Sequence, residues 1–463
     1  MSFISLQFLV FFMVVTLSYY QLKNQRMRVA LLLAASCYFY MAFVPKYILI
    51  LGGTIVIDYL AGLQIARSTG KSRKTWLIVS IIANVGVLAF FKYFNFLLEA
   101  FEPLIHWVSA GTELPFLQIL LPIGLSFHTF QAMSYTIEVY RGRQPPEKDF
   151  LTYALYVMFY PQLVAGPIER PQNVLPQLHR LQPYDSSQVR EGLARMLWGF
   201  FKKAVIADRL AMMVDYCYNH TSTLSSGSLL VGAIFYSFQI YCDFSGYCDI
   251  GIGAAKVMGI RLMENFDEPY RSRSISEFWT RWHISLSTWF RDYVYIPLGG
   301  NRLGEKRRKL NVLIVFLLSG LWHGANWTFV IWGGLHGMMT AFLPGKKRDS
   351  RSNAFIVNSL FVLVNFGIVT LFWVFFRSPS IKESLHYLGR IFHWTGGPFY
   401  VGLKINEVWG SVVLIIIMLL RERFRKSYYI KSSLAYASYF ALFVITVYML
   451  GVFNENQFIY FQF

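Results

Sequence analysis

The chain contains 463 residues, of which 55% are hydrophobic and 18% aromatic, whereas only 15% are Asp, Glu, Lys or Arg. Soluble globular chains carry about 25% charged residues, and one soluble core rarely grows beyond about 300 residues, so the composition excludes a disordered chain and argues against a single soluble domain. The formal net charge is +18, but the basic residues lie in short clusters between apolar segments. This distribution is typical of cytoplasmic loops and predicts no nucleic-acid partner.

Apolar segments of about 20 residues predict membrane-spanning helices. We expect them near residues 3–20, 29–44, 47–65, 76–98, 116–138, 192–218, 229–253, 354–376, 408–420 and 434–453. Residues 311–343 are long enough for a bent pair of spans, and 151–166 contains Pro161 and ends before Pro167, which predicts a broken or re-entrant helix. The sequence therefore predicts an all-α polytopic membrane protein with about 11 or 12 spans, formed by one membrane domain over residues 1–463.

Basic loops predict the orientation of the spans. Lys23–Arg28 follows the first span and Arg67–Lys74 the third, so both are expected on the cytoplasmic side, with the N-terminus outside. The alternation then carries Arg421–Lys431 to the cytoplasmic side and Phe463 to the exterior.

Histidines inside apolar segments are candidates for chemistry, because ionisable groups at membrane depth usually face a cavity or a partner. His323 lies between glycines, about a dozen residues into the apolar segment 311–343. His336 lies near the end of the same segment, and His128 lies in the predicted span 116–138. For His128 and His336 we favour a hydrogen-bonded packing role. For His323 we favour a general base, since imidazole can take a proton from a nucleophile and return it to a leaving group.

Residues 254–309 mix charges, aromatic rings and glycines, and chemistry is expected there. Within them, Phe278–Tyr293 gathers rings around Arg281, His283, Arg291 and Asp292. An interfacial helix has the same composition, since Trp and Tyr belong at headgroup level. Arginines near a cytoplasmic entrance equally suit a phosphate-bearing donor such as coenzyme A.

Two further features remain open. Asp243 and Asp249 lie six residues apart in an apolar segment; they could form a carboxylate pair or act separately as buried hydrogen-bond anchors, and the spacing disfavours one helical face. Residues 457–463 form an apolar, aromatic terminus that we expect to dock into a groove, where Tyr460 would present a phenolic nucleophile, or to lie at the membrane interface as an anchor.

Five motifs stand out in the sequence: Arg281-Trp282-His283-Ile284-Ser285-Leu286-Ser287, Arg291-Asp292-Tyr293, Leu321-Trp322-His323-Gly324-Ala325-Asn326-Trp327, Phe159-Tyr160-Pro161 and Phe458-Ile459-Tyr460-Phe461-Gln462-Phe463. Together they resemble the membrane-bound O-acyltransferases, and specifically their alginate O-acetyltransferase branch. The resemblance covers nearly the whole chain, with a catalytic core at about 120–345 and a C-terminal motif at 458–463.

The resemblance implies a funnel across the membrane, surrounded by spans and by re-entrant or interfacial helices. His323 matches the family's histidine, His283 matches a second motif position that assists or orients, and Tyr460 matches a tyrosine proposed to carry the acyl group in a related D-alanyl export system. Arg281, Trp282, Arg291, Trp322 and Asn326 are expected to bind the donor or the acceptor.

From these observations we predict a multi-pass O-acetyltransferase of the bacterial inner membrane. It would move an acetyl group from a cytoplasmic thioester, acetyl-CoA, to the exterior for O-acetylation of an exopolysaccharide, alginate, with a periplasmic partner that carries a Ser nucleophile. No bound cofactor or metal is expected, because the thioester is already activated. The alternatives are the same fold with another cargo (D-alanylation of teichoic acid, or acetylation of peptidoglycan or cellulose) and a non-catalytic polysaccharide transporter.

Overall fold

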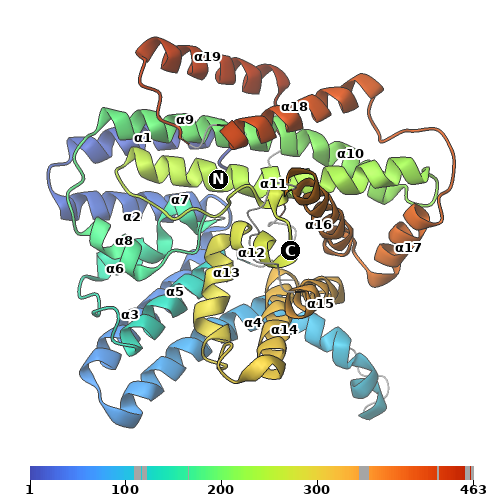
Figure 1. Ribbon diagram of the computed structural model, residues 1–463. Coiled ribbons are helices and arrows are strands. Elements are labelled where there is room, and N and C mark those ends of the chain that lie inside the picture. Colours follow the sequence, from blue (N-terminus) through green and yellow to red (C-terminus); the bar gives the residue numbers. More distant parts are fainter. Residues whose placement is uncertain are drawn as a thin grey trace. The chain divides into compact units, whose positions relative to one another are not determined.

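A computed structural model describes residues 1–108, 116, 122–164, 166–343, 354–424, 427–453 and 459. Every regular element in these residues is a helix, and one isolated β-bridge joins Phe266 to Trp282. The predicted all-α class is therefore confirmed for the described part of the chain (Figure 1).

The residues form two compact units. Unit 1 comprises Met1–Leu193 and Gly251–Met263, and unit 2 comprises Ala194–Ile250 and Glu264–Phe463. That residues 1–463 form one membrane domain stays a prediction.

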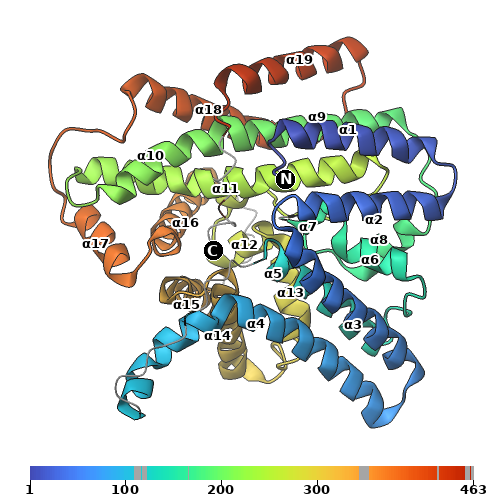
Figure 2. The same cartoon turned by 180° about the vertical axis from the view of Figure 1, so that it is seen from behind.

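Unit 1 is built from apolar helices that begin at polar caps. Ser5 accepts a hydrogen bond from the amide of Phe8 at 3.1 Å, and Asn24 accepts one from the amide of Arg26 at 2.8 Å. Figure 2 shows the first two helices running side by side. The helices are α1 (Leu6–Gln21), α2 (Gln25–Met41), η1 (Pro45–Tyr47), α3 (Ile48–Arg67), α4 (Gly70–Val108), α5 (Leu125–Tyr140), α6 (Phe150–Met158), α7 (Tyr160–Leu163) and α8 (Pro171–Leu178).

Unit 2 contains the second half of the chain. Its elements are η2 (Phe201–Ala207), α10 (Asp208–Asn219), η3 (Pro269–Arg271), α12 (Ile275–Arg281), α13 (Ile284–Phe290), η4 (Arg291–Tyr295), α14 (Gly304–His323), α15 (Trp327–Phe342), α16 (Ala354–Arg377), α17 (Ile381–Phe392), α18 (Ile405–Phe424) and α19 (Ser433–Leu450). Helices α9 (Ser186–Phe200) and α11 (Ser226–Val257) contain residues of both units.

Four helices of the described residues are long and apolar enough to cross a membrane. They cover Pro45–Arg67, Gly70–Glu102, Val357–Arg377 and Ser433–Leu450, and a shorter apolar helix covers Leu6–Gln21. Each coincides with a predicted span, so the membrane character is supported, while the total of about 11 or 12 spans stays a prediction.

The two predicted helix interruptions are both present. The helix over 151–166 breaks at Phe159, between α6 and α7, because Pro161 cannot continue a helical hydrogen-bond ladder. Residues 311–343 form the bent pair α14 and α15, which separate at Gly324. The mixed region 254–309, in contrast, folds into the short helices α12 and α13 and the segments η3 and η4.

Glycines bring α14 and α15 together, and the two helices lie side by side (Figure 1). A Cβ added to Gly320 would meet the carbonyl oxygen of Phe329, and one added to Gly333 would meet that of Phe316, each at less than 3.0 Å. The two backbones therefore touch in a way that only glycine permits. This contact fixes the end of α14, which carries His323.

Candidate active site

His323 is the last residue of α14, where the close packing against α15 ends. Its side chain is buried, with 3% exposure, and its ring packs edge-on against Trp332 of α15 at 5.1 Å between centroids. Phe376 of α16 contributes a second ring at 5.4 Å. Aromatic residues of α15 and α16 thus surround the imidazole at the end of α14. The catalytic role of His323 stays a prediction.

His283 lies in the short connection between α12 and α13, where its backbone is left-handed, with φ of 45°. Two neighbours hold this unusual conformation: the amide of Ile284 donates to the carbonyl of Asn265 at 3.0 Å, and the amide of Ser285 donates to the Asn265 side chain at 3.1 Å. A non-glycine residue with positive φ is strained, and such strain persists only where the surroundings impose it. The chain from Asn265 therefore determines where the His283 ring points.

The two histidines are neighbours in unit 2. Their ring centroids are 6.3 Å apart, and the Trp322 ring lies 6.0 Å from that of His283. Burial lowers the pKa of His283 to about 3, so its imidazole is neutral at physiological pH. A neutral ring can exchange a hydrogen bond with a reacting group without adding charge to the site.

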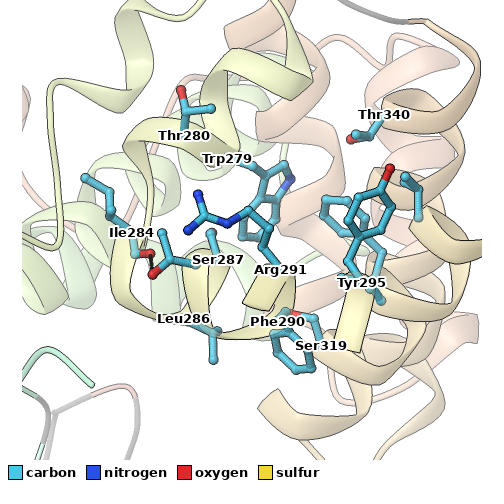
Figure 3. Close-up of a pocket in the computed structure, with 14 residues that line it drawn as sticks. Trp279, Thr280, Ile284, Leu286, Ser287, Phe290, Arg291, Tyr295, Ser319 and Thr340 are labelled. Atoms are coloured by element: carbon cyan, nitrogen blue, oxygen red, sulfur yellow. Dashed lines mark hydrogen bonds between the residues drawn. The ribbon is translucent and has the colours of Figure 1, made fainter. Parts of the chain in front are cut away.

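A cavity of about 390 Å³ lies between residues of the 279–295 region and residues of α14 and α15 (Figure 3), and its lining residues do not include His283 or His323. Ser319 lines it one helical turn before His323, and Ile284, next to His283, lines its other side. The walls are mainly apolar, and Arg291 lies among them between the residues of α12 and α13 and those near Tyr295. The cavity therefore combines an apolar lining with one guanidinium and suits a flexible chain with an anionic end.

The five residues predicted to bind substrate lie in different surroundings in the structure. Arg291 lines the cavity and pairs with Asp292 at 2.8 Å, and Trp322 lies beside His283. Trp282 is instead packed in the core, with 1% exposure, against Phe266 and Trp373, among other rings. These contacts are packing contacts, and substrate binding by Trp282 stays a prediction.

Arg281 and Asn326 make structural contacts. Arg281 pairs with Glu277 at 3.0 Å on α12, one turn apart. Asn326 caps α15 by accepting from the amide of Thr328 at 3.0 Å, and its side-chain nitrogen donates to the carbonyl of Pro379 at 2.9 Å. These contacts position the ends of α12 and α15, and substrate binding by either residue stays a prediction.

The other two membrane histidines have the hydrogen bonds expected of packing residues. In unit 1 His128 lies 2.7 Å from the hydroxyl of Thr54, and in unit 2 His336 accepts from the indole nitrogen of Trp279 at 3.2 Å. Tyr460 lies outside the described residues. Its neighbour Ile459 is described and is 4% exposed, so docking of the terminus is supported at this one position.

Asp243 and Asp249 bind separate cations rather than each other. Lys203 lies 2.6 Å from Asp243, and Lys202 lies 2.6 Å from Asp249, which also accepts from Arg195 at 2.8 Å. The two aspartates are therefore separate buried anchors, one of the two possibilities left open by the sequence.

These cations were missed by the sequence analysis, although a signal was present. Arg195, Lys202 and Lys203 lie inside a predicted apolar span, and basic residues at such depth require acidic partners.

Among the described residues, no three His, Cys, Asp or Glu side chains are grouped so as to hold a metal ion.

A family model decides the class of the protein. Residues 143–378, about half of the chain, match the membrane-bound O-acyltransferase family. The chain belongs to this family. Both His283 and His323 lie inside the matched region, and the chain is accordingly an acyltransferase of the membrane-bound type.

Curated relatives from several bacteria extend the match beyond that region. The chain is 42% identical over 391 residues to the probable alginate O-acetylase AlgI of Pseudomonas aeruginosa, covering 83% of this chain and 73% of that protein. It is 37% identical over 385 residues to the peptidoglycan O-acetyltransferase of Helicobacter pylori, covering 77% and 72%. The teichoic acid D-alanyltransferase of Bacillus subtilis is 26% identical over 234 residues, covering 47% and 57%.

Proposed function

We propose that this membrane O-acyltransferase takes an acetyl group from a cytoplasmic thioester, acetyl-CoA, and delivers it across the bacterial inner membrane for O-acetylation of an exopolysaccharide, alginate. The observation that carries the proposal is the pair of buried histidines, 6.3 Å apart. An apolar cavity with one arginine supports it, because its lining includes Ile284, next to His283, and Ser319, one turn before His323. The identity of about 40% to alginate O-acetylases over most of the chain supports the cargo and the polymer.

In the proposed reaction, an acceptor hydroxyl attacks the thioester carbonyl while His323 removes the hydroxyl proton. The new C–O ester bond forms, the C–S bond breaks, and His323 returns the proton to the leaving thiolate. Tyr460 is the proposed first acceptor, and His283 assists as a neutral hydrogen-bonding group. The reaction needs no further reactant, because the thioester supplies the activation.

The cavity is the proposed site of the donor. Its apolar walls would take up the acyl end and the pantetheine arm, and Arg291 would pair with a phosphate. A periplasmic partner with a Ser nucleophile would then collect the acetyl group and modify the polymer.

Peptidoglycan is the second candidate acceptor. The relative from Helicobacter pylori, a peptidoglycan O-acetyltransferase, covers 77% of this chain. The two acceptors differ only in the last transfer, so the chemistry at His323 would be the same.

Substitution of His323 tests the proposal. His323→Ala and His323→Gln should each abolish ester-linked acetate on the secreted polymer, measured by mass spectrometry after alkaline release, while the protein accumulates in the membrane at the normal level. His220→Ala is the control, because His220 is exposed at the end of α10, where its ring stacks on that of Tyr216 and its Nδ1 lies 2.9 Å from the Tyr216 carbonyl. Normal acetylation by both His323 variants would refute acyl transfer through this residue, as a transporter predicts.

A further inference from the structure

Ile459, the one described residue after Phe453, is bound to a buried carboxylate of unit 2. The amide of Ile459 donates to Oδ2 of Asp243 at 2.9 Å, and Oδ1 of Asp243 lies 2.6 Å from the ammonium of Lys203. Lys203 lies 2.6 Å from Asp208 as well. All three residues of this group are buried, with 1% exposure each.

The charges of this group explain why Asp243 needs a donor. One ammonium lies between two carboxylates, so a cluster with all three groups charged carries a net negative charge away from water. A buried carboxylate is stabilised by hydrogen bonds from N–H groups, and an amide hydrogen bond to a charged group is worth about 1.5–3 kcal/mol. The Ile459 amide provides such a donor to Oδ2 of Asp243.

A second attachment lies close by on the same segment of the chain. The carbonyl of Ala204, in the π-helical segment η2, accepts from the amide of Val452 at 2.9 Å. Arg209, just after η2, donates to the carbonyl of Leu450 at 2.8 Å. The chain after α19 is therefore held by the same residues, 203–209, that supply the partners of Asp243.

Ile459 is part of the hydrophobic core of unit 2. It belongs to the same cluster of buried residues as Trp332 and Phe376, which pack against the His323 imidazole. Displacing Ile459 would thus remove one member of the core to which these rings also belong.

We propose that Asp243, paired with Lys203, is the residue that seats Ile459, and with it the C-terminal attachment, in the core of unit 2. The inference rests on the proposed function for its consequence: Asp243 is a positioning residue for acyl transfer, acting through the seated segment. Asp249, six residues later on the same helix, is equally bound to a lysine but does not contact Ile459 in any described interaction. It therefore provides a matched control.

The first experiment measures seating directly, apart from any acyl transfer. Ile459→Cys retains the backbone amide, and the rate at which a water-soluble maleimide labels residue 459 is followed by mass spectrometry in purified, detergent-solubilised protein. Asp243→Leu should raise this rate at least 10-fold, whereas Asp249→Leu should leave it within about 2-fold. Asp243→Asn retains an acceptor oxygen and should keep most of the protection. Equal labelling of the Asp243→Leu and Asp249→Leu proteins would overturn the proposal.

The second experiment removes the donor. Ile459→Pro has no N–H, whereas Ile459→Ala keeps it and only shortens the side chain. We expect Ile459→Pro to reduce acetyl transfer about as much as Asp243→Leu, and the double variant to lose no more than the worse single variant, because both act through one hydrogen bond. Additive losses would contradict the shared interaction.

The two outcomes are separable from the proposed function. His323→Ala should leave residue 459 protected from maleimide, since the catalytic group takes no part in the attachment. If His323→Ala retained acetylation while Asp243→Leu exposed residue 459, the seating would stand and the acyl-transfer proposal would fail.

Discussion

The contact between α14 and α15 provides the sharpest test of how the fold positions His323. A methyl group added at Gly333 would lie less than 3.0 Å from the carbonyl oxygen of Phe316, whereas one added at the adjacent Gly334 would meet only the Leu317 side chain, at 3.6 Å. The same chemical change at neighbouring positions thus separates a backbone clash from an ordinary contact.

The structure gives the size of the expected effect. A comfortable carbon contact is about 3.5 Å or more, so Gly333→Ala must move the helices apart by roughly 1 Å. Overpacking of this kind costs about 1–3 kcal/mol, and a misplacement of about 1 Å at a catalytic group can cost 100-fold in rate. Gly334→Ala has no such cost, because Ala is favoured over Gly in a helix by about 1 kcal/mol.

We therefore expect Gly333→Ala to lower acetyl transfer by 10-fold or more and to lower the thermal midpoint in detergent. Gly334→Ala should keep near-normal activity and an equal or higher midpoint. The assays are acetate on the secreted polymer and fluorescence-detected unfolding. Equal activity and stability of the two proteins would refute the claim that backbone contact between α14 and α15 positions His323.

Two further predictions concern the donor cavity and pH. Arg291→Ala should raise the KM for the acyl donor about 10-fold. Its stability should change little, since an exposed ion pair is worth at most about 1 kcal/mol. The control is Arg307→Ala, because Arg307 is exposed and outside the cavity lining, and an equal KM in both variants would contradict donor binding by Arg291. His283 binds no proton in the folded state above a pKa of about 3 but does so in the unfolded state below 6.5, so its contribution to stability should be complete above pH 6.5 and fall by about 1.4 kcal/mol for each pH unit between 6.5 and about 3. His283→Asn, which tolerates the left-handed backbone, should show a shallower acid loss in the thermal midpoint, and an unchanged pH dependence would contradict burial as the cause.

Local sequence signals anticipated much of the helical architecture. Apolar length predicted the candidate spans, and Pro161 predicted the break between α6 and α7, because proline acts on its own helix whatever the surroundings. Glycines around His323 likewise indicated close approach of helices. The sequence signalled that an approach would occur, while its partner residues, the carbonyls of Phe329 and Phe316, appear only in the folded chain.

The site shows the same division. His323 and His283 are motif residues that the sequence singled out, but their separation of 6.3 Å depends on how α12, α13 and α14 pack, which no spacing of 40 residues specifies. Trp282, from the same motif as His283, packs against Phe266 and Trp373, and these contacts are equally absent from the motif itself.

By itself, the sequence determined that the chain is helical, apolar enough for a membrane and equipped with histidines at depth, because these properties depend on residue types and their order. Only the tertiary structure decided which charges meet: that Lys203 pairs with Asp243 and Lys202 with Asp249, and that Ile459 donates to the first aspartate. Pairing of buried charges is a question of distance in space. Residues about 40 positions apart, and one more than 200 positions away, come within 3 Å only because the helices that carry them pack together.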